Sequence, residues 1–352
     1  MTNNGCSETG PVAASVIIPT WDRPDLLRRT LEALTSQNGA PPFEVIVVEN
    51  GSAHTVSLAP SFPAVCFLRI PARGVCAARN AGTQKARAPL LIFLDDDVVP
   101  SSTFVEAHVH AHCGSRRRVA IGATRFVVDR EEAYPGTHFR AAESDRWART
   151  LLSSGNAPCD ARDFRTGNFS IHRDFLLEAK GFDEAFDPFG GEELDLALRL
   201  EMAKAEFAFA PQASGTHVGA GTEQSLYDKI QLLGRTEILV LRKHGHMRHP
   251  MLRGFVLGRH ASWRGRAFRW MFQHTPLALR GAQAVLGWLA GKTMLRKTAV
   301  ASLDYRVRRE WALWTGVRQA IDWPELENLV QNCQAAWREQ AAQGSGNRPG
   351  QL

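Results

Sequence analysis

The chain has 352 residues, enough for one large α/β domain with a smaller appendage. Its 44% hydrophobic and 22% charged residues are ordinary for a folded soluble protein. None of the six cysteines forms a C-x-x-C pair, which argues against a zinc knuckle or a disulfide framework and fits a reducing compartment. Because the first residues lack a signal-peptide pattern and no apolar stretch approaches the roughly 20 residues that span a bilayer, we expect a cytoplasmic protein, soluble or peripheral on the membrane.

The net charge of +6 is unevenly distributed along the chain. Residues 242–320 contain sixteen Lys and Arg against only Asp304 and Glu310, a local balance of +14 that leaves −8 for the rest. A basic C-terminal third beside an acidic remainder suggests two regions with different partners.

The first predicted element is a buried strand over Ala14–Ile18, which stops at Pro19. A helix follows, with Asp22 placed to cap it and Pro24 in its first turn. Residues at helical spacing indicate the buried face of this helix: Leu26, Leu27, Thr30, Leu31 and Leu34.

Further buried strands are predicted at residues 44–48, 65–70, 90–94 and 207–210, with a helix over Gly74–Lys85. Strands that alternate with helices indicate a mostly parallel α/β sheet flanked by helices. After about residue 235 the pattern becomes helical, and a last helix reaches about residue 340. We expect a flexible N-terminus over 1–11, an α/β domain over 12–240, a basic helical region over 241–342 and a disordered tail over 343–352.

Polar clusters follow three of the predicted strands, at Thr20–Asp22, Glu49–Ser52 and Asp95–Asp97. Ligands of such sheets bind at the carboxyl ends of the strands, so these clusters predict one site. The glycine-rich dinucleotide motif and the Walker motif are both absent from the sequence.

The strongest local signal is the triplet Asp95-Asp96-Asp97. Three adjacent carboxylates repel one another unless a cation compensates them, and Mg²⁺ or Mn²⁺ commonly bridges carboxylates to substrate phosphates. An acidic surface turn is the alternative, but an apolar strand that leads directly into such a turn is unusual.

Two later features permit both a structural and a chemical interpretation. Glu192, Glu193 and Asp195 follow two glycines, so they either complement a helix dipole or act in catalysis. His217, flanked by Gly215 and Gly219, is either a structural histidine or a ligand of a carboxylate-bound metal.

The motifs, taken in order, resemble a family 2 glycosyltransferase from about residue 13 to 220. The residues that carry this resemblance are VIIPT (16–20), EVIVVENGS (44–52), ARNAG (78–82), LIFLDDDVVP (91–100), TGN (166–168), GFDE (181–184) and FGGEELDLALRL (189–200). It implies a GT-A fold, which is a Rossmann-like, mostly parallel sheet flanked by helices, here with a helical C-terminal extension.

The resemblance also implies roles for individual residues. Pro19, Thr20 and Glu49 match positions that hold the base and ribose, and Arg79 one that contacts the base or diphosphate. The other donor-binding positions are Asp95, Asp96, Gly167 and Asn168. Asp97, Asp95 and His217 match a metal and diphosphate site for Mn²⁺ or Mg²⁺. Glu193 falls at the general base, with Glu192 or Asp195 as alternatives.

An inverting transfer from a UDP-, dTDP- or GDP-linked sugar to an acceptor hydroxyl follows from this resemblance. The chemistry agrees, because a cation neutralises the leaving diphosphate and a carboxylate takes the hydroxyl proton. A nucleotidyltransferase, or a catalytically silent carbohydrate- or lipid-binding module, is the alternative. Envelope or surface glycan synthesis would use a glycan or lipid-linked acceptor.

In the basic C-terminal region, arginines alternate with aromatic residues: Arg253, Phe255, Arg259, Trp263, Arg264, Arg266, Phe268, Arg269, Trp270 and Phe272. This pattern suits an anionic membrane surface, here the inner face of the membrane. A solvated helix that packs on the catalytic domain explains it equally well, and nucleic acid is the least favoured partner.

Overall fold

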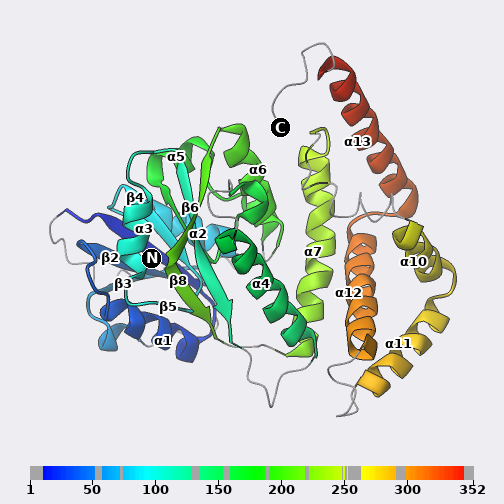
Figure 1. Ribbon diagram of the computed structural model, residues 1–352, viewed down its shortest axis with the longest axis horizontal. Coiled ribbons are helices and arrows are strands. Elements are labelled where there is room, and N and C mark those ends of the chain that lie inside the picture. The colour runs from blue at the N-terminus through cyan, green and yellow to red at the C-terminus, as the bar shows by residue number, and fades with distance from the viewer. Residues whose placement is uncertain are drawn as a thin grey trace. The chain divides into compact units, whose positions relative to one another are not determined.

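The computed structural model describes residues 11–51, 58–71, 74–127, 135–153, 159–187, 190–218, 222–247, 249, 252, 263–290 and 299–344. The chain forms two compact units, one up to residue 220 and the other from residue 221. The first unit contains the sheet and the second is helical (Figure 1). The predicted domain boundary at residue 240 falls inside the first helix of the second unit.

The elements of the first unit have these bounds: β1 Ala14–Thr20, α1 Pro24–Thr35, β2 Phe43–Asn50, β3 Val65–Ile70, α2 Val75–Lys85, β4 Leu90–Leu94, β5 Val98–Pro100, α3 Phe104–Ala111, β6 Arg118–Phe126, α4 Pro135–Ser153, β7 Asn168–His172, α5 Arg173–Glu178, α6 Glu192–Met202 and β8 Glu206–His217, with short 3-10 turns at Ala59–Ser61, Ala161–Asp163 and Glu184–Phe186.

The eight strands form one sheet in the order β3-β2-β1-β4-β7-β6-β8-β5. The pairs β1–β2, β1–β4, β2–β3 and β6–β8 are parallel, and the other three are antiparallel because β7 and β5 run against their neighbours. The predicted α/β class, a sheet flanked by helices with a helical C-terminal extension, is therefore confirmed, and the sheet, predicted to be mostly parallel, is mixed.

The side chains of β1 point alternately to the two faces of the sheet, and both faces are buried. Val16 and Ile18 pack in one core with α1 and α3, whose contributions include Leu31 and Phe104. Ile17 points to the other face, where an added Cβ on Gly82 of α2 would meet it at 2.4 Å. Since successive residues of a strand face opposite sides, β1 must be apolar throughout, as its sequence predicts.

Three local predictions need correction. Asp22 does not cap α1, because Arg23 occupies the capping position without a side-chain cap and Asp22 adopts a left-handed φ of 54°. The strand predicted at 207–210 continues to His217, and the helix predicted to end near 340 reaches Gly344. Residues 1–10 and 345–352 of the predicted flexible ends lie outside the described residues.

The second unit contains α7 Glu223–His244, α10 Trp263–His274, α11 Pro276–Ala290, α12 Ala299–Ala320 and α13 Trp323–Gly344. α7 and α12 pack closely, because an added Cβ on Gly234 would meet the carbonyl oxygen of Leu313 at 2.2 Å. None of the described helices is both long and apolar enough to cross a membrane. Residues 253–262, which hold much of the basic and aromatic pattern noted above, lie outside the described residues.

Candidate active site

The acidic triplet lies in the turn between β4 and β5, and the sheet register brings its partners to it. Val98 pairs with His217 where β5 meets β8, and the N–H of Val218 donates to the carbonyl of Asp97 at 2.8 Å. Leu94 pairs with Asn168, and the N–H of Asp95 donates to the carbonyl of Gly167 at 3.1 Å. Strand pairing therefore joins segments that lie more than 70 residues apart in sequence.

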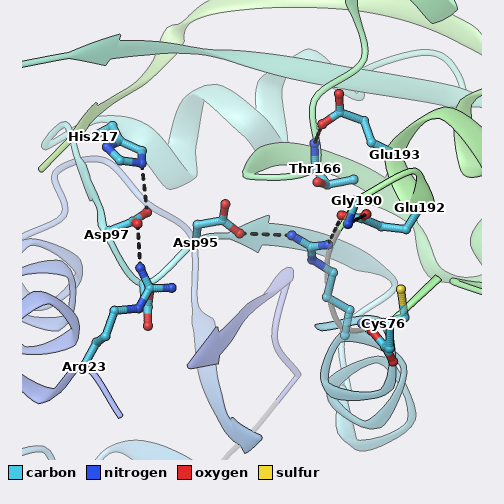
Figure 2. Close-up of polar contacts among 12 residues, drawn as sticks. Arg23, Cys76, Asp95, Asp97, Thr166, Gly190, Glu192, Glu193 and His217 are labelled. Carbon is cyan, nitrogen blue, oxygen red and sulfur yellow. Dashed lines mark hydrogen bonds and ion pairs between the residues drawn. The ribbon is translucent and has the colours of Figure 1, made fainter. Parts of the chain in front are cut away.

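Two arginines pair with the three carboxylates of the triplet. Arg23 lies 3.0 Å from Asp96 and 2.8 Å from Asp97, and Arg79 lies 3.0 Å from Asp95. Figure 2 shows Arg23 beside Asp97, with His217 on the other side of this carboxylate. Protein cations thus neutralise much of the repulsion for which the sequence had suggested a metal. Arg23 was not predicted as a site residue, although it is the only cation in the loop after β1.

Asp96 belongs to the interior of the domain and not to the open site. It is fully buried and accepts a hydrogen bond from the hydroxyl of Thr20 at 2.7 Å, which also commits the Thr20 side chain. Desolvation raises the pKa of Asp96 to about 7 against the opposing charge of Arg23. The side chains of Asp96 and Thr20 are both engaged in this contact. The structure therefore does not support the predicted contact between Asp96 and the donor, and it leaves only the backbone of Thr20 for the predicted donor contact of that residue.

Asp97 and His217 form a pair suited to a divalent cation. Nε2 of His217 lies 3.4 Å from Oδ1 of Asp97, and this buried oxygen accepts no hydrogen bond from the described residues. A carboxylate oxygen beside an imidazole nitrogen fits Mn²⁺ or Mg²⁺, which take their remaining ligands from substrate phosphates and water.

The predicted three-residue metal set is not assembled in the structure. The described part of the chain contains no group of three His, Cys, Asp or Glu side chains placed to hold a metal. Asp95 was expected to join Asp97 and His217, but its carboxylate pairs with Arg79 instead.

Beside the Asp97–His217 pair, the site contains a second group of charged side chains, with Arg79 at its centre. It is buried, lies 3.2 Å from Glu192 and 3.0 Å from Asp95, and its guanidinium stacks on the ring of Phe182 at 5.3 Å. Glu192 also accepts a hydrogen bond from the N–H of Gly190 at 3.0 Å, across a turn in which both glycines have positive φ. Arg79 and Glu192 therefore hold the turn before α6, while Asp95 remains 38% exposed.

Glu193 differs from its two acidic neighbours in α6. Its side chain is 40% exposed, whereas Glu192 is buried and Asp195 is fully buried in an ion pair with Arg199 at 2.6 Å. This burial excludes Asp195 as an alternative base. The N–H of Thr166 donates to Glu193 at 3.3 Å and Arg165, which the sequence did not indicate, lies 3.8 Å from it.

The pKa of the Glu193 carboxyl is raised. Desolvation by the surrounding protein is the largest cause, and it outweighs the opposing charge of Arg165, while the carboxylate of Glu192 adds to it. A carboxylate with a raised pKa that is still open to solvent is suited to accept a proton.

The other predicted donor-binding residues are set into the framework of the site. Pro19 and Glu49 are buried at the ends of β1 and β2. Asn168 is also buried, donates to the carbonyl of Ala213 at 3.0 Å and pairs with His108 at 2.9 Å, so its expected contact with the donor is not supported.

Gly167 does reach the site, through its lack of a side chain. An added Cβ would lie 2.6 Å from Oδ2 of Asp95. Gly167→Ala should therefore displace the Asp95 carboxylate and lower kcat/KM for the donor by about 10–100-fold. Steady-state kinetics measure this, and Gly281→Ala in α11, where an added Cβ meets nothing within 4 Å, is the matched control.

A buried histidine network lies behind Asn168. The hydroxyl of Ser170 lies 2.8 Å from His108 and 2.8 Å from His112, and burial lowers the pKa of these histidines to about 4 and about 3. Below the unfolded pKa of about 6.5 the unfolded chain binds protons that the folded chain does not, so stability falls as the pH drops toward 4.

Each of these two histidines should lower the free energy of unfolding by about 1.4 kcal/mol per pH unit as the pH falls from about 6 to 4.5. His108→Gln should remove one of the two contributions, as measured by urea unfolding at several pH values. The comparison uses the difference between the two proteins because the raised pKa of Asp96 acts in the opposite direction. Equal slopes in the two proteins would mean that His108 does not stay neutral.

The chain is similar to several known proteins. Residues 15–176 match the model of Glycosyl transferase family 2. The Validoxylamine A glucosyltransferase of Streptomyces hygroscopicus subsp. limoneus is 31% identical over 215 residues, which cover 53% of this chain and 47% of that protein. The Chondroitin synthase of Pasteurella multocida is 25% identical over 220 residues, which cover 54% of this chain and 23% of that protein.

Among solved structures, a mannosyltransferase from Pyrobaculum calidifontis in complex with GDP-Man and Mn²⁺ aligns with a TM-score of 0.47 and 17% identity, over 96% of this chain and 89% of that chain. The chain spans about half or less of the two curated relatives described above. Residues 15–176 are therefore similar to a family 2 glycosyltransferase domain, and the curated relatives that match the chain are glycosyltransferases or synthases.

Proposed function

We propose that this protein is an inverting, metal-dependent glycosyltransferase that moves a hexose from a UDP-, dTDP- or GDP-linked donor to an acceptor hydroxyl. One observation carries the proposal. The accessible side chains Asp95 after β4, Glu193 in the first turn of α6 and His217 at the end of β8 are among those that the family resemblance assigns to donor, base and metal. Their neighbours Asp96, Glu192 and Asp195 are buried in ion pairs.

Glu193 acts as the general base in this proposal. An acceptor hydroxyl has a pKa far above 7, so its proton must pass to the Glu193 carboxylate as the new glycosidic bond forms. The N–H of Thr166 and the guanidinium of Arg165 orient this carboxylate. Displacement by a single base on one side of the sugar inverts the anomeric centre.

Asp97 and His217 would hold the divalent ion, which supplies charge neutralisation for the leaving diphosphate. Arg23 orients Asp97 through the pair at 2.8 Å, and Arg79 keeps Asp95 at the donor side of the site. The strand-end positions Pro19, Thr20 and Glu49 would form the base and ribose pocket.

The acceptor in this proposal is a lipid-linked or envelope glycan that is presented at the inner face of an anionic membrane. The basic C-terminal third supports such a partner, because positively charged segments are attracted to anionic lipid.

Thermal-shift measurements with UDP, dTDP and GDP, each with and without Mn²⁺, test the donor. A nucleotide at a hundredfold its Kd should stabilise the fold by about 2.7 kcal/mol, and we expect this only with Mn²⁺. Product analysis with the matching sugar nucleotide follows. Pyrophosphate release from a nucleoside triphosphate would instead support a nucleotidyltransferase, and binding without turnover would support a silent binding module.

A further inference from the structure

Arg165 is a partly exposed cation beside Glu193, in the segment between the 3-10 turn Ala161–Asp163 and β7. Its side chain is 46% exposed, and its Nη1 lies 3.8 Å from the Glu193 carboxylate. This separation exceeds that of a hydrogen bond, so the two groups attract each other without committing any N–H donor of the guanidinium. The ion pair with Glu193 alone therefore does not account for the position of Arg165.

The backbone on both sides of Arg165 is anchored. The preceding residue, Phe164, is almost fully buried, and the following residue, Thr166, is buried as well. The N–H of Thr166 donates to the Glu193 carboxylate at 3.3 Å. Because the neighbours of Arg165 are packed into the domain, the segment holds this cation at a fixed place relative to the proposed base.

The guanidinium of Arg165 is also held in one orientation. Nη1 donates to the backbone carbonyls of Arg162 at 3.1 Å and of Phe164 at 2.6 Å. The group stacks on the ring of Trp147 in α4 at 5.2 Å, and the indole N–H of Trp147 in turn donates to Asp163 at 3.1 Å. The protein thus binds Nη1 and one face of the guanidinium, which keeps the rest of the group in a constant direction.

The remaining edge of this guanidinium is unused. Nε and Nη2 donate to no acceptor among the residues that the structure describes. The carboxylates nearest in sequence are engaged elsewhere, since Asp160 pairs with Arg162 and Asp163 accepts from Trp147. Two adjacent guanidinium N–H groups form a fork that receives a carboxylate or a phosphate through two parallel hydrogen bonds. A fork that is already oriented loses little entropy when such a group binds.

We propose that Arg165 binds an oxyanion of the acceptor, a phosphate or a carboxylate carried near the hydroxyl that Glu193 deprotonates. That hydroxyl must come within about 3 Å of Glu193, so an anionic group on the same sugar residue, or attached to it, comes within reach of Arg165. This inference rests on the proposed function, in which Glu193 is the base, and it names the chemical class of the acceptor. Arg165 determines specificity and takes no part in bond formation.

Calorimetric titration of the full chain with glucose 6-phosphate, glucuronate and glucose tests the inference. EDTA is present throughout, so that no metal ion holds the phosphate at the Asp97–His217 pair. We expect one of the two anionic sugars to bind at least about tenfold more tightly than glucose, because the hydrogen bonds to it are charge-assisted. The tighter of the two identifies the oxyanion as phosphate or carboxylate.

Variants assign this preference to the Arg165 side chain. Arg165→Gln should abolish the preference, whereas Arg165→Lys, which keeps the charge but lacks the fork, should retain only part of it. Arg162→Gln is the matched control, because Arg162 is an exposed arginine of the same segment that pairs with Asp160, and it should bind like the unchanged protein. Circular dichroism verifies that each variant is folded.

Three results would overturn the inference. These are equal affinity for glucose and both anionic sugars, a preference that persists in Arg165→Gln, or an equal loss in Arg162→Gln. If Arg165→Gln shifted only the pH dependence of kcat and left the preference intact, Arg165 would act on Glu193 alone. The titration involves no sugar transfer, so its failure leaves the proposed function to product analysis, and a clear preference without any product would instead refute the proposed function.

Discussion

Replacing Glu193 by glutamine is expected to lower kcat by about 10²–10⁴-fold, the usual contribution of a general base. Nucleotide affinity should remain nearly unchanged, because Glu193 lies beside Thr166 and Arg165 and not beside the Asp97–His217 pair. Single-turnover kinetics give the first quantity and calorimetric titration with the nucleoside diphosphate gives the second.

The pH dependence makes this assignment more specific. Because the base is active only when deprotonated, kcat should rise with pH through the pKa of Glu193, at a higher pH than an ordinary glutamate would give. In Glu193→Gln this acid limb should disappear together with most of the activity.

Glu192→Gln is the matched control, since it makes the same chemical change one residue away. Glu192 holds the buried Arg79, so this substitution should cost about 1–3 kcal/mol of stability while the acid limb of kcat remains. A full loss of the limb in Glu192→Gln, with normal kinetics in Glu193→Gln, would move the base to Glu192.

The sequence predicted the central parallel strands well and the antiparallel part poorly. β1, β2 and β4 are continuous β-branched or leucine-rich runs because both of their faces are buried. β7 has only five residues and contains Asn168 and Ser170, which pair with buried histidines. Polar residues of this kind interrupt the apolar pattern by which a buried strand is recognised in a sequence. Only the pairing of β7 with β4 in the structure shows its place in the sheet.

The sequence likewise indicated where the site lies, but it did not indicate which of its carboxylates are buried, because tertiary contacts decide this. The run of three aspartates identified the strand end, but Asp96 is buried while Asp95 is accessible because Arg23 and Thr20 approach from one side and Arg79 from the other. Those partners are distant in sequence. Asp195 is a different case, because its partner Arg199 is only four residues later in α6, and what the sequence could not indicate is the complete burial of this pair's carboxylate.

Asp97→Asn is expected to weaken Mn²⁺ binding by more than about a hundredfold and to lower transfer at least as much, because it removes the anionic member of the Asp97–His217 pair. Calorimetric titration of Mn²⁺ in the presence of the nucleoside diphosphate measures the affinity without relying on turnover. Asp96→Asn is the matched control, since the buried Asp96 faces Thr20 and Arg23 and should leave Mn²⁺ affinity nearly unchanged.

A substitution of Arg23 is expected to change Mn²⁺ affinity in the opposite direction. Its guanidinium lies 2.8 Å from the other oxygen of Asp97 and so competes electrostatically with any cation bound there. Arg23→Gln should therefore strengthen Mn²⁺ binding while it destabilises the fold without metal, because Asp96 then loses its cation partner. If Asp97→Asn abolished transfer with unchanged Mn²⁺ affinity, and Arg23→Gln also left that affinity unchanged, Asp97 would act on the substrate and the cation would bind elsewhere.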